Sequence, residues 1–121
     1  MPNVHVVFYR EADGAVPVLE WLDGLPEKAL DKCVVRIERL AELGHELRRP
    51  EADYLREGIY ELRTHFQMVN YRILYFLHRR GTAVLVHALT KKEEIPARDI
   101  ELAVRRKRRF EAEPKRHTAE E

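Results

Sequence analysis

The stretch YELRTHFQMVNYRILYF (60–76), followed after a short turn by TAVLVHALTKK (82–92), decides the fold. It is rich in β-branched and aromatic residues, which are typical of strands. The same stretch carries a set of basic side chains at intervals along the expected strands: Arg63, Arg72, His87, Lys91 and Lys92. A cationic cluster on a sheet indicates a phosphate-rich partner.

Two expected hairpins fix which side chains share a face. A turn at His65 and Phe66 pairs Arg63 with Met68, and a turn at residues 79–80, closed by Gly81, pairs Arg72 with His87. One face then carries a polar set: Glu61, Arg63, Asn70, Arg72, His87 and, if pairing continues, Lys91. The opposite face is almost purely apolar: Tyr60, Leu62, Val69, Tyr71, Ile73, Tyr75, Val84, Val86 and Ala88. This separation supports the assumed register.

The remaining segments add one strand and three helices. Residues 3–9 predict a strand, 16–25 a short helix, and 27–43 an amphipathic helix whose apolar residues recur at intervals of three and four. Residues 45–58 form a connector with room for a short strand around Tyr54, and the three main strands cover about 59–64, 67–78 and 82–89. A last helix begins at Pro96. Residues 111–121 lack a periodic apolar pattern and predict a disordered polar tail.

Length and composition favour one domain, spanning residues 1–110. The 121 residues are 45% hydrophobic and 36% charged, with a formal net charge of +1. The charge is segregated, because residues 1–47 carry −4 and residues 48–116 carry +7. A basic later half suits nucleic acid. The single cysteine, Cys33, excludes an intrachain disulfide, and no apolar run reaches the roughly 18 residues of a membrane span. A cytoplasmic protein without a membrane partner is expected.

The order of elements predicts an α+β domain. We expect a small, largely antiparallel sheet of about four strands, with an N-terminal helical hairpin and the C-terminal helix packed on one face. The other face is then open to solvent and presents the polar set.

Several blocks of sequence carry a resemblance to a known family. In chain order they are PVLEWLDGLP (17–26), LREGIYELR (55–63), YRILYF (71–76), HALTKK (87–92) and, after Pro96, DIELA (99–103). Together they resemble the phage-derived, HigB-like branch of the RelE toxin superfamily. The fold that this resemblance implies is the RelE-like α+β domain described above.

The resemblance implies the toxin of a type II toxin–antitoxin pair, an endoribonuclease that cleaves mRNA, usually on the ribosome. It implies metal-free attack by the ribose 2′-OH on its own phosphate, with no cofactor. The basic positions of the family match Arg63, Arg72, Lys91 and Lys92. Arginine suits this chemistry because it stays charged and binds phosphate oxygens bidentately.

The proton-transfer groups are assigned separately. His87 is a candidate acid or base with a pKa near neutrality, and Glu61 is either a second base or the residue that orients Arg63. The catalytic candidates are therefore Arg63, Arg72, His87 and Glu61, and the RNA-binding candidates are Lys91, Lys92, Asn70 and His65. Each also has a structural reading: ion pairs for the arginines, a satisfied histidine for His87, and a solvated strand end for the lysines.

The implied partners are mRNA, the ribosome and a small helix-turn-helix antitoxin, with a homodimer or a heterotetramer with antitoxin as possible assemblies. Two other classes stay open. A non-catalytic nucleic-acid-binding module needs only the basic face. A phage-derived interaction protein needs neither arginine. A metal site is not expected, because the carboxylates have no ligand-like spacing.

Overall fold

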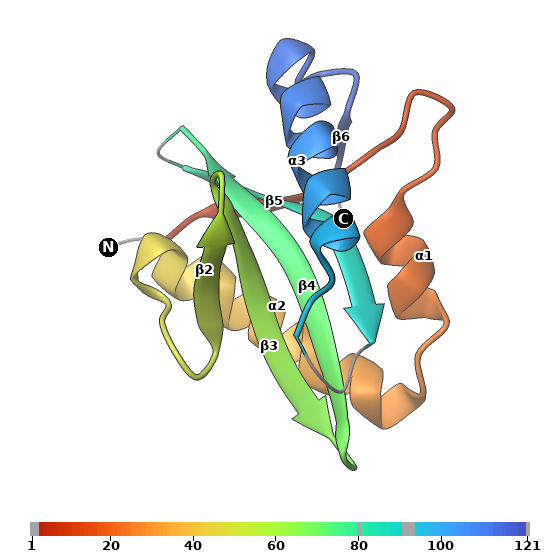
Figure 1. Cartoon of the computed structure of the whole chain (residues 1–121), viewed down its shortest axis with the longest axis vertical. Coiled ribbons are helices and arrows are strands. Elements are labelled where there is room, and N and C mark those ends of the chain that lie inside the picture. Colours follow the sequence, from red (N-terminus) through yellow and green to blue (C-terminus); the bar gives the residue numbers. More distant parts are fainter. Residues whose placement is uncertain (1–2, 80, 91–93, 121) are drawn as a thin grey trace.

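The computed structural model describes residues 3–79, 81–90 and 94–120. In these residues the elements are β1 (His5–Tyr9), α1 (Pro17–Asp23), α2 (Glu27–Leu43), the 3-10 turn η1 (Gly44–Glu46), β2 (Ala52–Arg56), β3 (Ile59–Phe66), β4 (Val69–His78), β5 (Thr82–Thr90), α3 (Ala97–Ala112) and β6 (Thr118–Ala119). They form one sheet in the order β2-β3-β4-β5-β1-β6 (Figure 1). The α+β class is confirmed.

The expectation of about four largely antiparallel strands is wrong, because the described residues form a mixed sheet of six strands. β1 runs parallel to β5, and only β6 separates it from the edge of the sheet. β2 pairs with β3 and confirms the short strand allowed around Tyr54, whereas β6, which pairs with β1, was not expected. Short strands of this kind carry little periodic signal of their own.

The helices lie on both faces of the sheet, not on one. α1 and α2 cover one face, where Val18, Leu22, Cys33 and Leu40 pack in the larger core cluster. α3 covers part of the other face, where Ala103, Val104 and Phe110 pack in a second cluster. α1 packs mainly on β5 and α2 on β3, so they do not form the expected helical hairpin (Figure 1).

The sequence of β4 explains why both faces are covered. Ile73, Leu74, Tyr75 and Phe76 are consecutive and all buried, so the strand has apolar side chains of both parities. A strand with this pattern needs packing on both sides. Ile73 and Tyr75 face α1 and α2, whereas Leu74 and Phe76 face α3.

The first hairpin turns two residues later than expected. Gln67 and Met68, with φ of 50° and 68°, form the turn, and Arg63 pairs with Arg72 instead of Met68. The partner has moved by four residues, an even number, so the expected grouping of side chains is retained. Glu61, Arg63, Asn70 and Arg72 share one face, as predicted.

The second hairpin has a different register from the expected one. Arg72 pairs with Leu89, while His87 pairs with Leu74. An irregularity in pairing follows at Leu74 and Tyr75, and beyond it Val84 pairs with Phe76. Val84 and Val86 consequently pack on the α3 face, not on the face of Tyr75 where we expected them. The bulge changes parity at one point, which alternation alone does not reveal.

The segment after α3 is a strand and turn where the sequence predicts a polar tail. His117 stacks on Tyr9, with ring centroids 5.2 Å apart, and its Nδ1 lies 2.7 Å from the carbonyl oxygen of Arg10. The polar composition hid this contact because one aromatic ring, rather than a periodic stripe, anchors the segment. No helix in the described parts of the chain is both long and apolar enough to cross a membrane.

Candidate functional site

The predicted polar residues of β3 and β4 form three successive rows on the α3 face of the sheet. Glu61 is opposite Leu74, Arg63 is opposite Arg72, and His65 is opposite Asn70. The alternation of strand side chains places these rows on one face, about 7 Å apart along the strands. The structure therefore brings together five of the eight predicted site residues: Glu61, Arg63, His65, Asn70 and Arg72.

Glu61 and Arg72 form a buried ion pair across the two strands. Arg72 Nε lies 3.0 Å from Glu61 Oε1, and each side chain is 11% exposed. Burial raises the pKa of Glu61 from its ordinary value of 4.5, against the lowering effect of Arg72 and Arg63. Burial likewise lowers the pKa of Arg72, so for both groups desolvation outweighs their mutual attraction.

Arg63 differs from its neighbour in having no close carboxylate. Across residues 3–79, 81–90 and 94–120, no acidic side chain lies within ion-pair distance of the Arg63 guanidinium. The charge of Arg63 acts to lower the pKa of Asp53 and of Glu61. Asp53 is nevertheless bound by Arg49, whose Nε and Nη2 lie 2.9 and 2.6 Å from Asp53 Oδ2. The Arg63 charge is thus available to an external anion.

Two grooves meet at the arginine pair. The α2 groove, about 470 Å³, is lined by residues of α2, of β3 and β4, and by Pro50: Asp31, Lys32, Val35, Arg36, Pro50, Arg63, Thr64, His65, Asn70 and Arg72. The α3 groove, about 490 Å³, lies before and beside α3 and is lined by Arg49, Asp53, Leu55, Glu61, Arg63, Arg72, Glu94, Ile95 and Ile100. Arg63 and Arg72 line both grooves.

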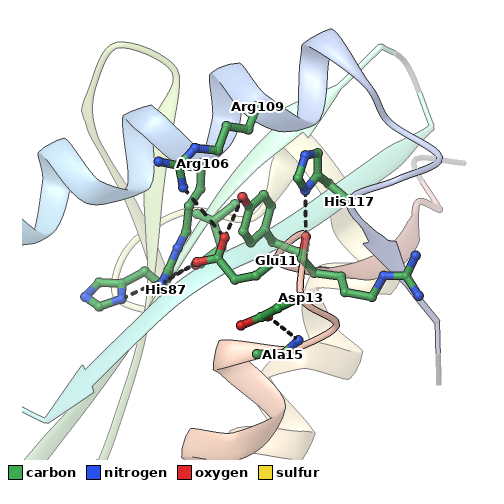
Figure 2. Close-up of polar contacts among 10 residues, drawn as sticks. Glu11, Asp13, Ala15, His87, Arg106, Arg109 and His117 are labelled. Atoms are coloured by element: carbon green, nitrogen blue, oxygen red, sulfur yellow. Dashed lines mark hydrogen bonds and ion pairs between the residues drawn. The ribbon is translucent and has the colours of Figure 1, made fainter.

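His87 points toward α3, and neither groove is lined by it. Its Nε2 lies 2.7 Å from Asp99 Oδ1. Its Nδ1 lies 3.4 Å from Arg106 Nη1, as Figure 2 shows. A neutral ring satisfies both partners, because Nε2–H donates to the carboxylate and Nδ1 accepts from the guanidinium. Burial, with a smaller contribution from Arg106, lowers the pKa of His87 from its ordinary value of 6.5. This environment matches the structural reading of a satisfied histidine.

Arg106 joins α3 to β5 and to Glu11, which follows β1. Its Nη1 donates to the carbonyl oxygen of Val86 at 2.7 Å, and its Nη2 lies 3.3 Å from Glu11 Oε2. The Tyr9 hydroxyl donates to the other Glu11 oxygen at 3.0 Å (Figure 2). No role was predicted for Arg106 from the sequence. The buried arginine was missed, although it follows the apolar stripe of Ala103 and Val104.

Two predicted residues cannot be placed, and two others were not anticipated. Lys91 and Lys92 lie outside the described residues. Lys32 and Arg36 on α2 line the α2 groove, although sequence reasoning treated that helix only as a source of core residues. Their spacing of four residues placed them on one face, but nothing in the sequence tied that face to the arginine strands.

Among the described residues, no group of three or more His, Cys, Asp or Glu side chains is arranged to hold a metal ion.

The model of one protein family matches the chain. The family is described as "Phage derived protein Gp49-like (DUF891)", and the match covers residues 20–108, about three quarters of the chain. It spans all six predicted site residues that the structure describes. This family is toxin-like, of the RelE/HigB type, so the resemblance is confirmed at that level, while the narrower HigB assignment stays a prediction. No curated protein matches the chain.

Proposed function

The chain belongs to the phage-derived Gp49-like family, and from this premise we propose that it is a HigB-like toxin of a type II toxin–antitoxin pair. Its proposed activity is metal-independent endoribonuclease cleavage of mRNA on the ribosome. It acts in the cytoplasm, and a small helix-turn-helix antitoxin blocks the grooves in the neutral complex.

The observation that carries the proposal is the Arg63–Arg72 pair at the junction of two grooves. Like charges directly opposite each other on neighbouring strands destabilise a sheet. Glu61 offsets only one of the two charges by an ion pair. A phosphate between the guanidiniums supplies the missing negative charge. It also places the reacting phosphorus where preorganised cations stabilise the charge that develops in the transition state.

The groups that transfer protons are best sought on either side of this pair. Glu61 and His65 lie two residues before and after Arg63, on the same face. The raised pKa of Glu61 makes its carboxylate a stronger base toward the 2′-OH, and His65 is an exposed imidazole suited to protonate the 5′-oxygen. His87 is held between Asp99 and Arg106, so we assign it to positioning α3.

The test uses expression of the chain from a tightly repressed promoter and mapping of new mRNA 5′ ends. We expect growth arrest and new ends in wild type, and loss of both in Arg63→Ala. Arg105→Ala, which removes an exposed arginine on α3, is the matched control and should behave as wild type. Thermal unfolding of each purified variant separates loss of activity from loss of fold.

A second assay addresses the chemistry. Purified toxin, first freed of divalent metal by chelator and then of the chelator by dialysis, is added to translating ribosomes, and the products are examined for 2′,3′-cyclic phosphate and 5′-hydroxyl ends. Products with 5′-phosphate and 3′-hydroxyl ends contradict the proposed mechanism, because attack by the 2′-OH cannot form them. RNA binding without any cleavage would favour the non-catalytic binding module. Growth effects that survive Arg63→Glu would favour a phage-derived interaction protein.

A further inference from the structure

The α2 groove has a different charge from the α3 groove. Among the described residues, its lining has four permanently basic side chains, Lys32, Arg36, Arg63 and Arg72, against one acidic side chain, Asp31. Among the described residues that line it, the α3 groove has three of each sign. Within the described chain, the excess of positive charge therefore lies in the α2 groove. A polyanion crossing the pair gains most by continuing in that direction.

Lys32 and Arg36 present two cations along one edge of this groove. They are four residues apart in α2, so they are on the same side of the helix, about 6 Å apart along its axis. Lys32 is exposed, and it makes no ion pair with any residue that the structure describes. Nothing in the core packing of α2 requires it, because Ala29, Cys33 and Leu40 supply the buried contacts.

Arg36 has hydrogen-bonding capacity that the fold leaves unused. Its only acidic contact in the described chain is Glu51, 3.6 Å from Nη1. Glu51 is already bound through both oxygens by Arg39, at 2.9 Å each, which lowers the pKa of Glu51. Arg36 Nε is buried and has no hydrogen-bond partner. Because the contact with Glu51 is long, the terminal N–H groups of Arg36 can donate to phosphate oxygens.

We propose that Lys32 and Arg36 form a phosphate subsite, which binds the RNA phosphate next to the one held by Arg63 and Arg72. The substrate is then single-stranded RNA that runs from the arginine pair into the α2 groove, past His65 and Asn70. This inference rests on the proposed function, because it takes the arginine pair as the position of the scissile phosphate. It adds a binding element from a helix to a site otherwise built on strands.

The subsite is tested with labelled RNA that cannot be cut because every 2′-OH is methylated. Binding of a ten-nucleotide RNA is measured over a range of KCl concentrations for wild type and Lys32→Ala. We expect Lys32→Ala to bind roughly 3- to 10-fold more weakly at 0.1 M salt, with the slope of log affinity against log salt reduced by about 0.7. Lys115→Ala, an exposed lysine outside the α2 groove, should bind as wild type.

A shorter ligand shows which phosphate is lost. A methylated dinucleotide has one internucleotide phosphate, and the arginine pair binds that phosphate. Wild type and Lys32→Ala should therefore bind the dinucleotide equally. Arg36→Ala should repeat the Lys32→Ala pattern, with urea unfolding as the check on its packing near Glu51. Equal binding of the ten-nucleotide RNA by wild type and Lys32→Ala overturns the subsite. So does an equal loss with the dinucleotide, or failure of wild type to bind RNA.

The two proposals fail separately. If wild type cuts no RNA but Lys32→Ala shows the length-dependent loss of binding, the nuclease proposal fails and the subsite holds. If wild type cuts mRNA and Lys32→Ala binds and cuts as wild type does, the subsite fails and the nuclease holds.

Discussion

Arg63 and Arg72 are directly opposite each other on β3 and β4, yet Glu61 forms an ion pair with Arg72 alone within the described chain. The two arginines therefore contribute differently to the stability of the fold. Arg72 is one half of a buried pair, whereas Arg63 is a half-buried cation held in place by its strand. This difference matters for any mutational test, since loss of activity has two possible origins at Arg72 and one at Arg63.

We expect Arg72→Ala to destabilise the protein far more than Arg63→Ala. Removing Arg72 leaves the Glu61 carboxylate buried without its partner, which typically costs about 3–5 kcal/mol. Removing Arg63 relieves repulsion between like charges and should change the free energy of unfolding by less than about 1 kcal/mol in either direction. Urea unfolding measures both.

The control for this comparison is the double variant Glu61→Gln, Arg72→Gln. It removes both charges and should recover most of the stability lost in Arg72→Ala, because neither side chain then buries an unpaired ion. Equal destabilisation by Arg63→Ala and Arg72→Ala would contradict the assigned roles.

The environment of His87 predicts a pH-dependent stability. Its pKa is lowered in the folded state, so below its ordinary value of 6.5 the unfolded chain binds the proton first. The contribution of neutral His87 is therefore present above pH 6.5 and is lost as the pH falls toward the folded-state pKa. Protonation also places a second cation beside Arg106.

Chemical denaturation at pH 7.5, 6.5 and 5.5 measures this effect. Wild type should lose stability across the series, and His87→Gln should show a flatter dependence, even if it is less stable at pH 7.5. His65→Gln, at an exposed position, is the matched control and should follow wild type. A slope unchanged by His87→Gln would rule out His87 as the titrating group.

Alternation along β3 and β4 was enough to group Glu61, Arg63, Asn70 and Arg72, because an error of an even number of residues in the turn leaves every side chain on its face. The same reasoning failed at β5, where one residue is skipped between the partners of Leu74 and Tyr75. This bulge changes once which residues of β5 face α3, and the local sequence pattern does not reveal it.

The layering of the helices was misjudged for a related reason. The expected apolar face included Ile73 and Tyr75 but not Leu74 and Phe76, which are buried and need cover on the other face. α3 provides that cover: the rings of Phe110 and Phe76 pack edge to face, with their centroids 5.5 Å apart. Lys32 and Arg36 were missed because they share a groove with Arg63 only through the packing of α2 on β3. That packing is a tertiary relationship, which the local sequence does not show.

His117 predicts a stabilising role for the C-terminal segment. Its ring stacks on Tyr9 and its Nδ1–H donates to the Arg10 carbonyl. Loss of one hydrogen bond and one aromatic contact should cost about 1–2 kcal/mol in His117→Ala. Lys115→Ala, in the same turn, should cost less than about 0.5 kcal/mol. Thermal unfolding compares the two, and equal melting temperatures would show that the segment does not stabilise the sheet.

Cys33 offers a probe of the core that does not depend on any functional proposal. The Cys33 thiol is fully buried on the core side of α2, and burial raises its pKa to about 11. Since only the thiolate reacts with disulfide reagents, native protein at pH 8 should be modified very slowly, at a rate set by opening of the core. In 6 M urea the thiol should react fully within the mixing time of a few seconds, because both burial and the pKa shift are lost.

Arg72→Ala should react faster than wild type in buffer, since lower stability raises the population of open states. Arg63→Ala should react as slowly as wild type. Rapid, complete modification of the native wild-type protein would contradict the packing of α2 on the sheet.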